Sequence, residues 1–307
     1  MNYPTTNGAF DTTHNGKSDV FITKLSPTGS SLIYSTFIGG SGDDIGNSVA
    51  IDSSVNIYIS GWTEDSTIDY PATSEAYDPT HNGDIDVFVT KLNSAGSSLV
   101  YSTFLGGSGW DYGSDIAIDP NNNACINGHT EDHINNFPIT NNAYDRSNNG
   151  KTDVFVTKLN SAGSSLVYST FIGGSDDDYG SSLVVDLSGN VYITGLTIES
   201  TPCYPTTSGA YDTTHNGAID VFVTKLNSAG SSLVYSTFIG GSGWDYGGSI
   251  AIDSSRNAYV IGTTESGIDF PITNGSFDLT HNGDWDVFIT KLNSVGSDLA
   301  YSTFLGG

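Results

Sequence analysis

The chain has 307 residues, with 34 aspartates and glutamates against nine lysines and arginines, and its formal net charge at pH 7 is −25. A polyanion of this kind repels the phosphate backbone of nucleic acids and the anionic surface of membranes, so neither is expected as a partner. No apolar run approaches the roughly 20 residues of a transmembrane helix, which argues against membrane insertion. Residues 1–10 lack the basic and apolar regions of a signal peptide, so an export signal would have to lie outside this sequence.

A repeat of 66 to 67 residues dominates the sequence. The segment DVFVTKLNSAGSSLVYSTF at 86–104 recurs unchanged at 153–171 and 220–238, and near-copies occupy 19–37 and 286–304. A fixed period of this length is typical of repeat architectures. We therefore predict one repeat domain over residues 1–307.

Each repeat holds four short runs rich in Val, Ile, Tyr, Phe and Thr, a composition typical of β-strands. In chain order, the first set is VFITKL (20–25), LIYSTFIG (32–39), SVAID (48–52) and NIYISGW (56–62). The turns between them are rich in Gly and Ser, as tight reversals require. A polar insertion of about 23 residues with few strand signals, such as 63–85, follows the fourth run.

The strand sequence VFVTKL has apolar side chains on both faces, with Val87 and Val89 on one side and Phe88 and Leu92 on the other. A sheet with one solvent face would alternate more cleanly. Such a strand needs a covering layer on each side, and four antiparallel strands without the insertion match the size of one propeller blade. A β-solenoid would show a shorter period, and no apolar stripe of helical period is found.

The predicted fold is therefore all-β: a β-propeller of four-stranded antiparallel blades, with about four and a half repeats of about 67 residues. A half blade covers 1–40, and blades follow at about 41–107, 108–174, 175–241 and 242–307. Three outcomes remain open for the half blade. The chain is part of a larger ring of roughly six to eight blades, or a five-bladed ring with one thin blade, or its open edges pair with another copy.

The motifs DVFVTKLN, LVYSTFLGGSG, DYG, IAID and GNVYITG resemble the bacterial SBBP β-propeller repeat, and the AIDSSxNxY hairpin is similar to the NHL repeat. The resemblance covers nearly the whole chain and implies a β-propeller in a secreted or cell-surface protein, without implying a reaction. The long YPxTxxAYDxTHNG insertion departs from that pattern. In NHL naming, strand A is 48–52, B is 56–62, C is 20–25 and D is 32–39.

This strand order predicts two different faces. The short A–B and C–D turns share one face, here called the turn face. The D–A loops and the B–C insertions share the opposite face, here called the loop face. Because propeller function usually lies on one such face, we expect function on the loop face.

The first candidate site on the loop face is an aromatic motif that occurs twice, Trp110–Asp111–Tyr112 and Trp244–Asp245–Tyr246. Aromatic rings beside Asp and Gly are able to stack on a sugar. The alternative is that these rings pack over the neighbouring insertion, since Tyr and Trp fill loop gaps well.

The second candidate is a repeated set of oxygen-bearing side chains on a Gly-containing turn, a pattern that suits Ca²⁺. The spacing is not that of an EF-hand. The alternative is a network of Asx turns that ties the insertion to strand C. The five sets are Asp11, Asn15 and Asp19; Asp78, Asn82 and Asp86; Asp145, Asn149 and Asp153; Asp212, Asn216 and Asp220; and Asp278, Asn282 and Asp286.

Other repeated polar residues are interpreted as structural. The TKL lysines are expected to form Lys–Glu or Lys–Asp bridges between strands, with the glutamates that follow strand B as candidate partners. His129 and His133 are interpreted as loop residues rather than zinc ligands, the THNG histidines as turn residues, and Cys125 and Cys203 as unpaired. The lysines are Lys24, Lys91, Lys158, Lys225 and Lys291, and the glutamates are Glu64, Glu131, Glu199 and Glu265.

These features predict a non-catalytic extracellular or cell-surface propeller that acts as a structural scaffold or adhesion module. Near-identical copies offer few of the unique residues that an asymmetric active site needs. Two alternatives are a self-assembling filament subunit joined through open blade edges, and a glycan-binding propeller. The expected partners are a protein or glycan on a cell surface or other copies of the chain, and the one suggested cofactor is Ca²⁺.

Overall fold

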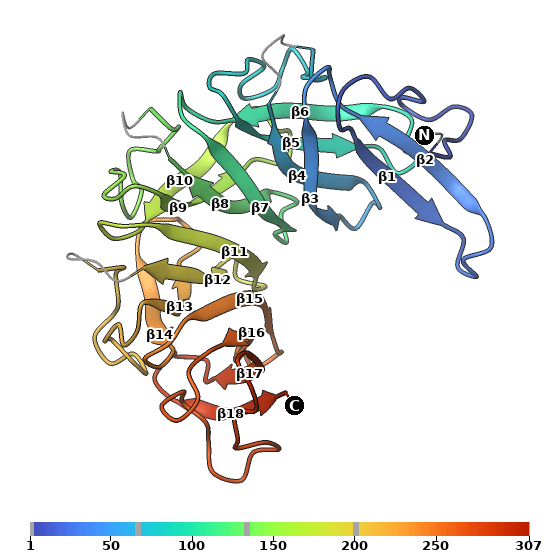
Figure 1. Ribbon diagram of the computed structural model, residues 1–307. Helices are drawn as coiled ribbons and strands as arrows, with labels where there is room; N and C mark the ends of the chain where they lie inside the picture. Colours follow the sequence, from blue (N-terminus) through green and yellow to red (C-terminus); the bar gives the residue numbers. More distant parts are fainter. Residues whose placement is uncertain (1–2, 65–68, 132–135, 199–202, 307) are drawn as a thin grey trace. The chain divides into compact units, whose positions relative to one another are not determined.

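The computed structural model describes residues 3–64, 69–131, 136–198 and 203–306. Within these residues the chain is all-β, with eighteen strands and no helix (Figure 1). The strands form four four-stranded sheets and one two-stranded sheet. The predicted β-propeller blades are confirmed.

Each sheet is built from strands that follow one another in the chain. The two-stranded sheet pairs β1 (Val20–Leu25) with β2 (Leu32–Ile38). The four-stranded sheets are β3 (Asp44–Ile51), β4 (Ile57–Thr63), β5 (Asp86–Leu92) and β6 (Leu99–Leu105); β7 (Asp111–Ile118), β8 (Ala124–Thr130), β9 (Asp153–Leu159) and β10 (Leu166–Ile172); β11 (Asp178–Val185), β12 (Val191–Ile198), β13 (Ile219–Leu226) and β14 (Leu233–Ile239); and β15 (Asp245–Ile252), β16 (Ala258–Thr264), β17 (Asp286–Leu292) and β18 (Leu299–Leu305).

The first strand of each four-stranded sheet is longer than the sequence predicts. We expected 48–52, but β3 begins four residues earlier, at Asp44. The register between β3 and β4 shifts between Gly46 and Ser48, which marks a β-bulge. The bulge interrupts the alternation of side chains, so the pattern before it is not recognised as strand.

The chain divides into two compact units. The first comprises residues 1–126, 134–138 and 158–167, and the second comprises residues 127–133, 139–157 and 168–307. In the first unit, a buried apolar cluster joins Val20 and Ile38 of the two-stranded sheet to Ile59 of the next sheet. In the second unit, a cluster joins Val221 to Val260 of the last sheet. Within each unit, neighbouring sheets therefore bury their faces against each other.

Strand burial confirms the need for cover on both faces. All seven residues of β5 are buried. In β17, buried residues alternate with partly exposed ones, as in a strand with one covered face. β1 pairs only with β2 among the described strands, and Phe21 and Leu25 on it are 53% and 54% exposed. Self-assembly through open blade edges stays a prediction.

The insertions are packed rather than free loops in the parts that the structure describes. Tyr70 is buried and stacks on Phe88, with ring centroids 4.9 Å apart. Its hydroxyl group lies 3.0 Å from Thr90 Oγ1, and the Thr73 amide donates to the Ser102 carbonyl group. These contacts fix the insertion against β5 and β6.

The turn between strands C and D holds each sheet against its neighbour through a glycine. Gly230 has a positive φ of 69°, and a Cβ atom there would fall on the ring of Tyr168. The Gly230 carbonyl group accepts a hydrogen bond of 2.8 Å from the Tyr144 amide. Gly96, Gly163 and Gly296 have the same conformation, each against a tyrosine ring.

We predict that Gly230→Ala destabilises the protein much more than Gly209→Ala. Gly209 also has a positive φ, of 82°, but its Cβ position is open. Alanine at 209 then carries only the backbone cost of about 1 kcal/mol. At 230 the displaced Tyr168 ring adds about 1–3 kcal/mol. Urea unfolding of both variants measures the difference, and equal losses would contradict the packing role.

Candidate functional site

The loop face is built where the strands A and C begin. The residue before strand C forms a parallel bridge with the residue before the following strand A, as in Ile85 with Trp110 and Ile219 with Trp244. The Asp111 amide donates to the Ile85 carbonyl group at 2.8 Å. The insertion and the D–A loop therefore meet at one place in each repeat.

The predicted calcium sets lie in this loop region, and hydrogen bonds already connect their members. The Asn82 amide donates to Asp86 Oδ2 at 2.8 Å, and the Asn82 side chain donates to Asp78 Oδ2 at 2.7 Å. The sets at 11–19, 145–153 and 212–220 repeat both bonds. In the last set, the Asn282 side chain donates to the Thr280 carbonyl group instead. This arrangement is the Asx-turn network that was the alternative to Ca²⁺, and binding of Ca²⁺ by these sets stays a prediction.

In four of the five sets the last aspartate is buried in the sheet, unlike the first two members, whereas Asp19 of the first set is partly exposed. Asp86, Asp153, Asp220 and Asp286 are at most 1% exposed. Burial raises the pKa of Asp86 to about 6 and that of Asp153 to about 7. These carboxyl groups therefore differ chemically from the partly exposed Asp78 and Asp145, which the sequence pattern did not reveal.

The aromatic motif does not act as one surface group. Trp110 and Trp244 are 45% and 47% exposed, whereas Asp111 and Asp245 are fully buried at the first position of a strand. Our expectation that Asp and Tyr of this motif lie in a loop was wrong. The β-bulge after Tyr extends the strand to include them.

The two tyrosines of the motif pack on other rings. Tyr112 meets Trp62 edge-on at 5.6 Å, and Tyr246 stacks on Trp285 at 5.4 Å. The tyrosines therefore pack on neighbouring side chains, which was the alternative to sugar stacking. The two tryptophans are about half exposed, and ligand binding by them stays a prediction.

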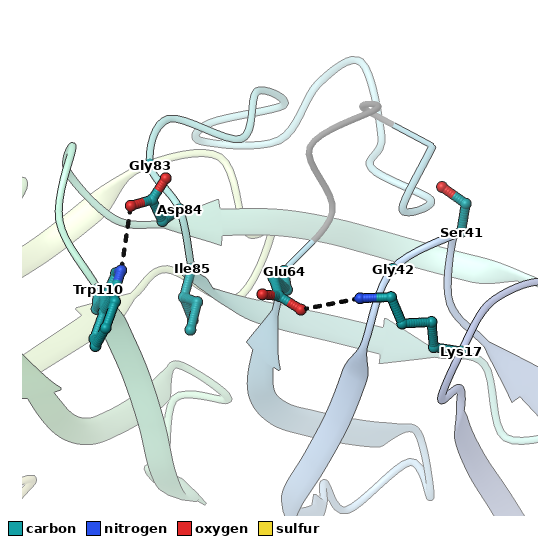
Figure 2. Close-up of a pocket in the computed structure, with 8 residues that line it drawn as sticks. All are labelled: Lys17, Ser41, Gly42, Glu64, Gly83, Asp84, Ile85 and Trp110. Carbon is teal, nitrogen blue, oxygen red and sulfur yellow. Dashed lines mark hydrogen bonds and ion pairs between the residues drawn. The ribbon is translucent and has the colours of Figure 1, made fainter.

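A depression of about 460 Å³ opens on the loop face of the first unit (Figure 2). Trp110 forms one wall, and its indole Nε1 donates to Asp84 Oδ2 at 3.2 Å. On the other side, Lys17 Nζ lies 3.5 Å from Glu64 and 3.4 Å from Asp43. The depression thus combines an exposed aromatic face with groups of both charges.

The TKL lysines lie on the turn face and pair with aspartates. Lys91 Nζ is 3.3 Å from Asp52 Oδ2 and 4.5 Å from the centre of the Tyr58 ring. Burial would raise the pKa of Asp52, but hydrogen bonds from the side chain and backbone of Asn56 and from Lys91 lower that pKa to about 2. The same bridge recurs at Lys158–Asp119, Lys225–Asp186 and Lys291–Asp253. The Lys–Asp form of the expected bridge is confirmed, and Glu199 lies outside the described residues.

The histidines and cysteines have structural surroundings. His81, His215 and His281 each place Nε2 3.1–3.2 Å from a threonine carbonyl oxygen at the end of strand B, which confirms them as turn residues. His129 lies on β8 edge-on to Tyr179, where burial lowers its pKa to about 4, and His133 lies outside the described residues. Cys125 is buried and Cys203 is exposed, and no disulfide joins them.

Two kinds of feature are absent from the described residues. No helix there is long and apolar enough to cross a membrane. No three His, Cys, Asp or Glu side chains among those residues gather in a group that could hold a metal ion.

Comparison with known families identifies the repeat. Residues 33–66, 167–200 and 234–269 match the SBBP beta-propeller repeat. No curated protein matches the chain.

Solved structures resemble the chain only distantly. A protein of unknown function from Dyadobacter fermentans has a TM-score of 0.49 and 10% identity, over 96% of this chain and 75% of its own. An apocarotenoid oxygenase from Synechocystis has a TM-score of 0.43 and 10% identity, over 92% and 55%. A GH43_1 enzyme from Xanthomonas citri has a TM-score of 0.36 and 9% identity, over 84% and 86%. At these values the likeness carries no argument about function.

We predict that Lys91→Met lowers the free energy of unfolding by about 3 kcal/mol, because it leaves Asp52 charged and buried without its cation. The double variant Asp52→Asn/Lys91→Met should regain part of that loss. Lys17→Met removes an exposed lysine as a control and should change little. Denaturant unfolding measures all three, and a single variant no worse than the control would contradict the structural role.

Proposed function

We propose that this chain of SBBP-type β-propeller repeats is a non-catalytic scaffold or adhesion module of a secreted or cell-surface protein, with the loop face as its interaction surface. The main support for the proposal is the pattern of differences between the repeats. The buried strands repeat almost unchanged, whereas exposed positions of the loop face change in charge and size from copy to copy. A protein that binds a partner through loops on a rigid scaffold needs constant buried residues and variable exposed ones.

Two positions illustrate the variation. The residue after the THNG-type turn is Lys17, Asp84, Lys151, Ala218 or Asp284. The residue before strand A is Asp43, Trp110, Asp177 or Trp244. Their contacts change accordingly, from a Lys–Asp ion pair in the first repeat to a Trp–Asp hydrogen bond in the second.

The buried ionisable groups support a non-catalytic role. The lysines on the turn face recur with the same aspartate partner in each complete repeat. The pair is buried in three of these repeats and partly exposed in the last. An ion pair that recurs in the same position of each repeat supports the structure that all the repeats share. Such repetition favours structure over a single reactive centre.

An adhesion assay tests the surface. Beads coated with the chain should bind cell-surface protein or polysaccharide, and Lys17→Glu/Lys151→Glu should weaken that binding several-fold because both changes alter the loop face. Lys24→Glu/Arg256→Glu makes the same change in charge on the turn face and should leave binding intact. Equal effects of the two double variants would contradict the assignment of the face, and cleavage of a bound polymer would contradict the non-catalytic role.

Glycan binding is the second candidate, and the depression beside Trp110 favours it. An exposed indole face next to carboxylate and ammonium groups provides both stacking and hydrogen bonding to a sugar. Trp244 offers a similarly exposed ring in the second unit. This candidate narrows the adhesion proposal to one class of ligand.

We predict that Trp110→Ala/Trp244→Ala lowers glycan affinity by about tenfold, as loss of aromatic stacking would. A glycan array identifies the ligand, and titration of the best hit gives the affinities. Phe277→Ala removes an aromatic ring that is 86% exposed and serves as the control. Binding that survives in the tryptophan variant would exclude these rings as the site.

A further inference from the structure

Two pairs of buried aspartates in the second unit hold carboxylate oxygens that have no hydrogen-bond partner. Each pair joins the aspartate that opens strand C of one sheet to the aspartate that opens strand A of the next. The pairs are Asp220 with Asp245 and Asp153 with Asp178. All four residues are at most 1% exposed, and the Oδ1 atom of each is buried and unpartnered.

The two carboxyl groups of the first pair converge on Gly240. Asp220 Oδ1 and Asp245 Oδ2 lie 2.6 and 2.8 Å from the point that a Cβ atom of residue 240 would occupy. A side chain there would fill the space between the carboxyl groups, so the glycine keeps it open. The Oδ2 atoms accept hydrogen bonds. The Asn216 amide donates to Asp220 Oδ2 at 2.9 Å, and the Gly241 amide and the Ser266 hydroxyl group donate to Asp245 Oδ2 at 2.8 and 3.0 Å.

The second pair has the same construction. The Asn149 amide donates to Asp153 Oδ2 at 2.9 Å, and the Gly174 amide donates to Asp178 Oδ2 at 2.6 Å. The carboxyl group of Asp153 reaches the Cβ position of Gly173, within 2.9 Å. In each pair, backbone donors thus orient both carboxyl groups while the Oδ1 atoms have no hydrogen-bond partner within the usual distance. The Thr197 and Thr264 side chains nevertheless act to lower the pKa of Asp178 and Asp245, against the effect of burial.

Two buried carboxylates this close carry an electrostatic cost. Burial raises the pKa of Asp178 to about 7, and the charge of Asp153 adds to the rise. Burial likewise raises the pKa of Asp220 to about 6, with a further rise from Asp245, although the Asn216 amide and His215 lower it. The described basic groups of strand C are engaged elsewhere, since Lys225 and Lys291 pair with aspartates on the turn face. A positive charge at the pair would remove this cost.

We propose that each pair is a binding site for a hard divalent cation, with Ca²⁺ as the cation of best fit. Oxygen atoms are the ligands that Ca²⁺ prefers, and its flexible coordination allows carboxylates to be completed by backbone carbonyl groups and water. The carbonyl oxygens of Gly241 and Gly243 face Gly217, which lies three residues before Asp220 in the chain. The proposed site has only two carboxylates, whereas a site of three or more acidic side chains would need fewer carbonyl groups and water molecules to complete the coordination of Ca²⁺.

This site is distinct from the Asp–Asn–Asp sets considered from the sequence. Asp220 belongs to both, but Asp212 and Asn216 are committed to each other by a hydrogen bond of 2.8 Å and lie toward solvent. The cation would instead lie inward, between strand C of one sheet and strand A of the next. Its binding would join consecutive blades within the unit.

Calcium titration of the full chain tests the proposal. After chelation and dialysis, the wild type should bind Ca²⁺ by isothermal titration calorimetry, and millimolar Ca²⁺ should raise its melting temperature by at least about 5 °C. Asp178→Asn/Asp245→Asn should lose two equivalents of bound Ca²⁺ and most of the shift. Because an asparagine amide is able to donate to the partner's Oδ1, this variant should fold at least as well as the wild type without Ca²⁺.

The control removes the same two charges from the surface. Asp284 and Asp298 are exposed, and Asp284→Asn/Asp298→Asn should keep the wild-type stoichiometry and shift. A wild type that neither binds Ca²⁺ nor responds to it would overturn the proposal and leave the pairs neutralised by a proton or by water. Calcium binding that persists unchanged in Asp178→Asn/Asp245→Asn would also overturn it and would point to the exposed Asp–Asn–Asp sets.

Discussion

Burial of both faces of each inner sheet is the constraint on which the rest of this structure depends. A strand such as β5, with every residue buried, is stable only between two covering layers. Apolar clusters supply this cover between neighbouring sheets within each unit. The near-identity of the repeats follows, because identical surfaces must meet at each successive contact, and a change in one copy would have to suit the copy on either side.

The same constraint places charged groups where water is scarce. On the turn face, Lys91, Lys158 and Lys225 are buried and Lys291 is partly exposed, and each pairs with an aspartate of the A–B turn. In three of the repeats the lysine also packs over a tyrosine ring. On the loop face, aspartates are buried in pairs without such a cation. The two faces therefore differ in electrostatics: one has compensated charge and the other has negative charge that calls for a proton or a metal ion.

In the function that we propose, binding depends on the exposed loop-face positions at which the repeats differ. Lys17 and Trp110 occupy partly or fully exposed positions of the loop face. Lys17 and Trp110 therefore face one depression in the first unit, although they come from different repeats. A symmetric frame thereby acquires local differences, as a binding surface requires.

The sequence by itself determined the repeat, the all-β class, the order of strands in each blade and the two-stranded start, because these follow from periodicity and from apolar residues on both strand faces. It also identified Asp86 and Asp220 as members of a recurring polar turn. Only the tertiary structure decided which of those aspartates are buried and what they face. Asp220 and Asp245 are 25 residues apart in different sheets, and no local pattern shows that their carboxyl groups converge. The β-bulge that follows Asp245 and Tyr246 could not be predicted from the sequence either. It breaks the alternation of side chains by which strands are recognised, and its position is defined only by the pairing of β15 with β16.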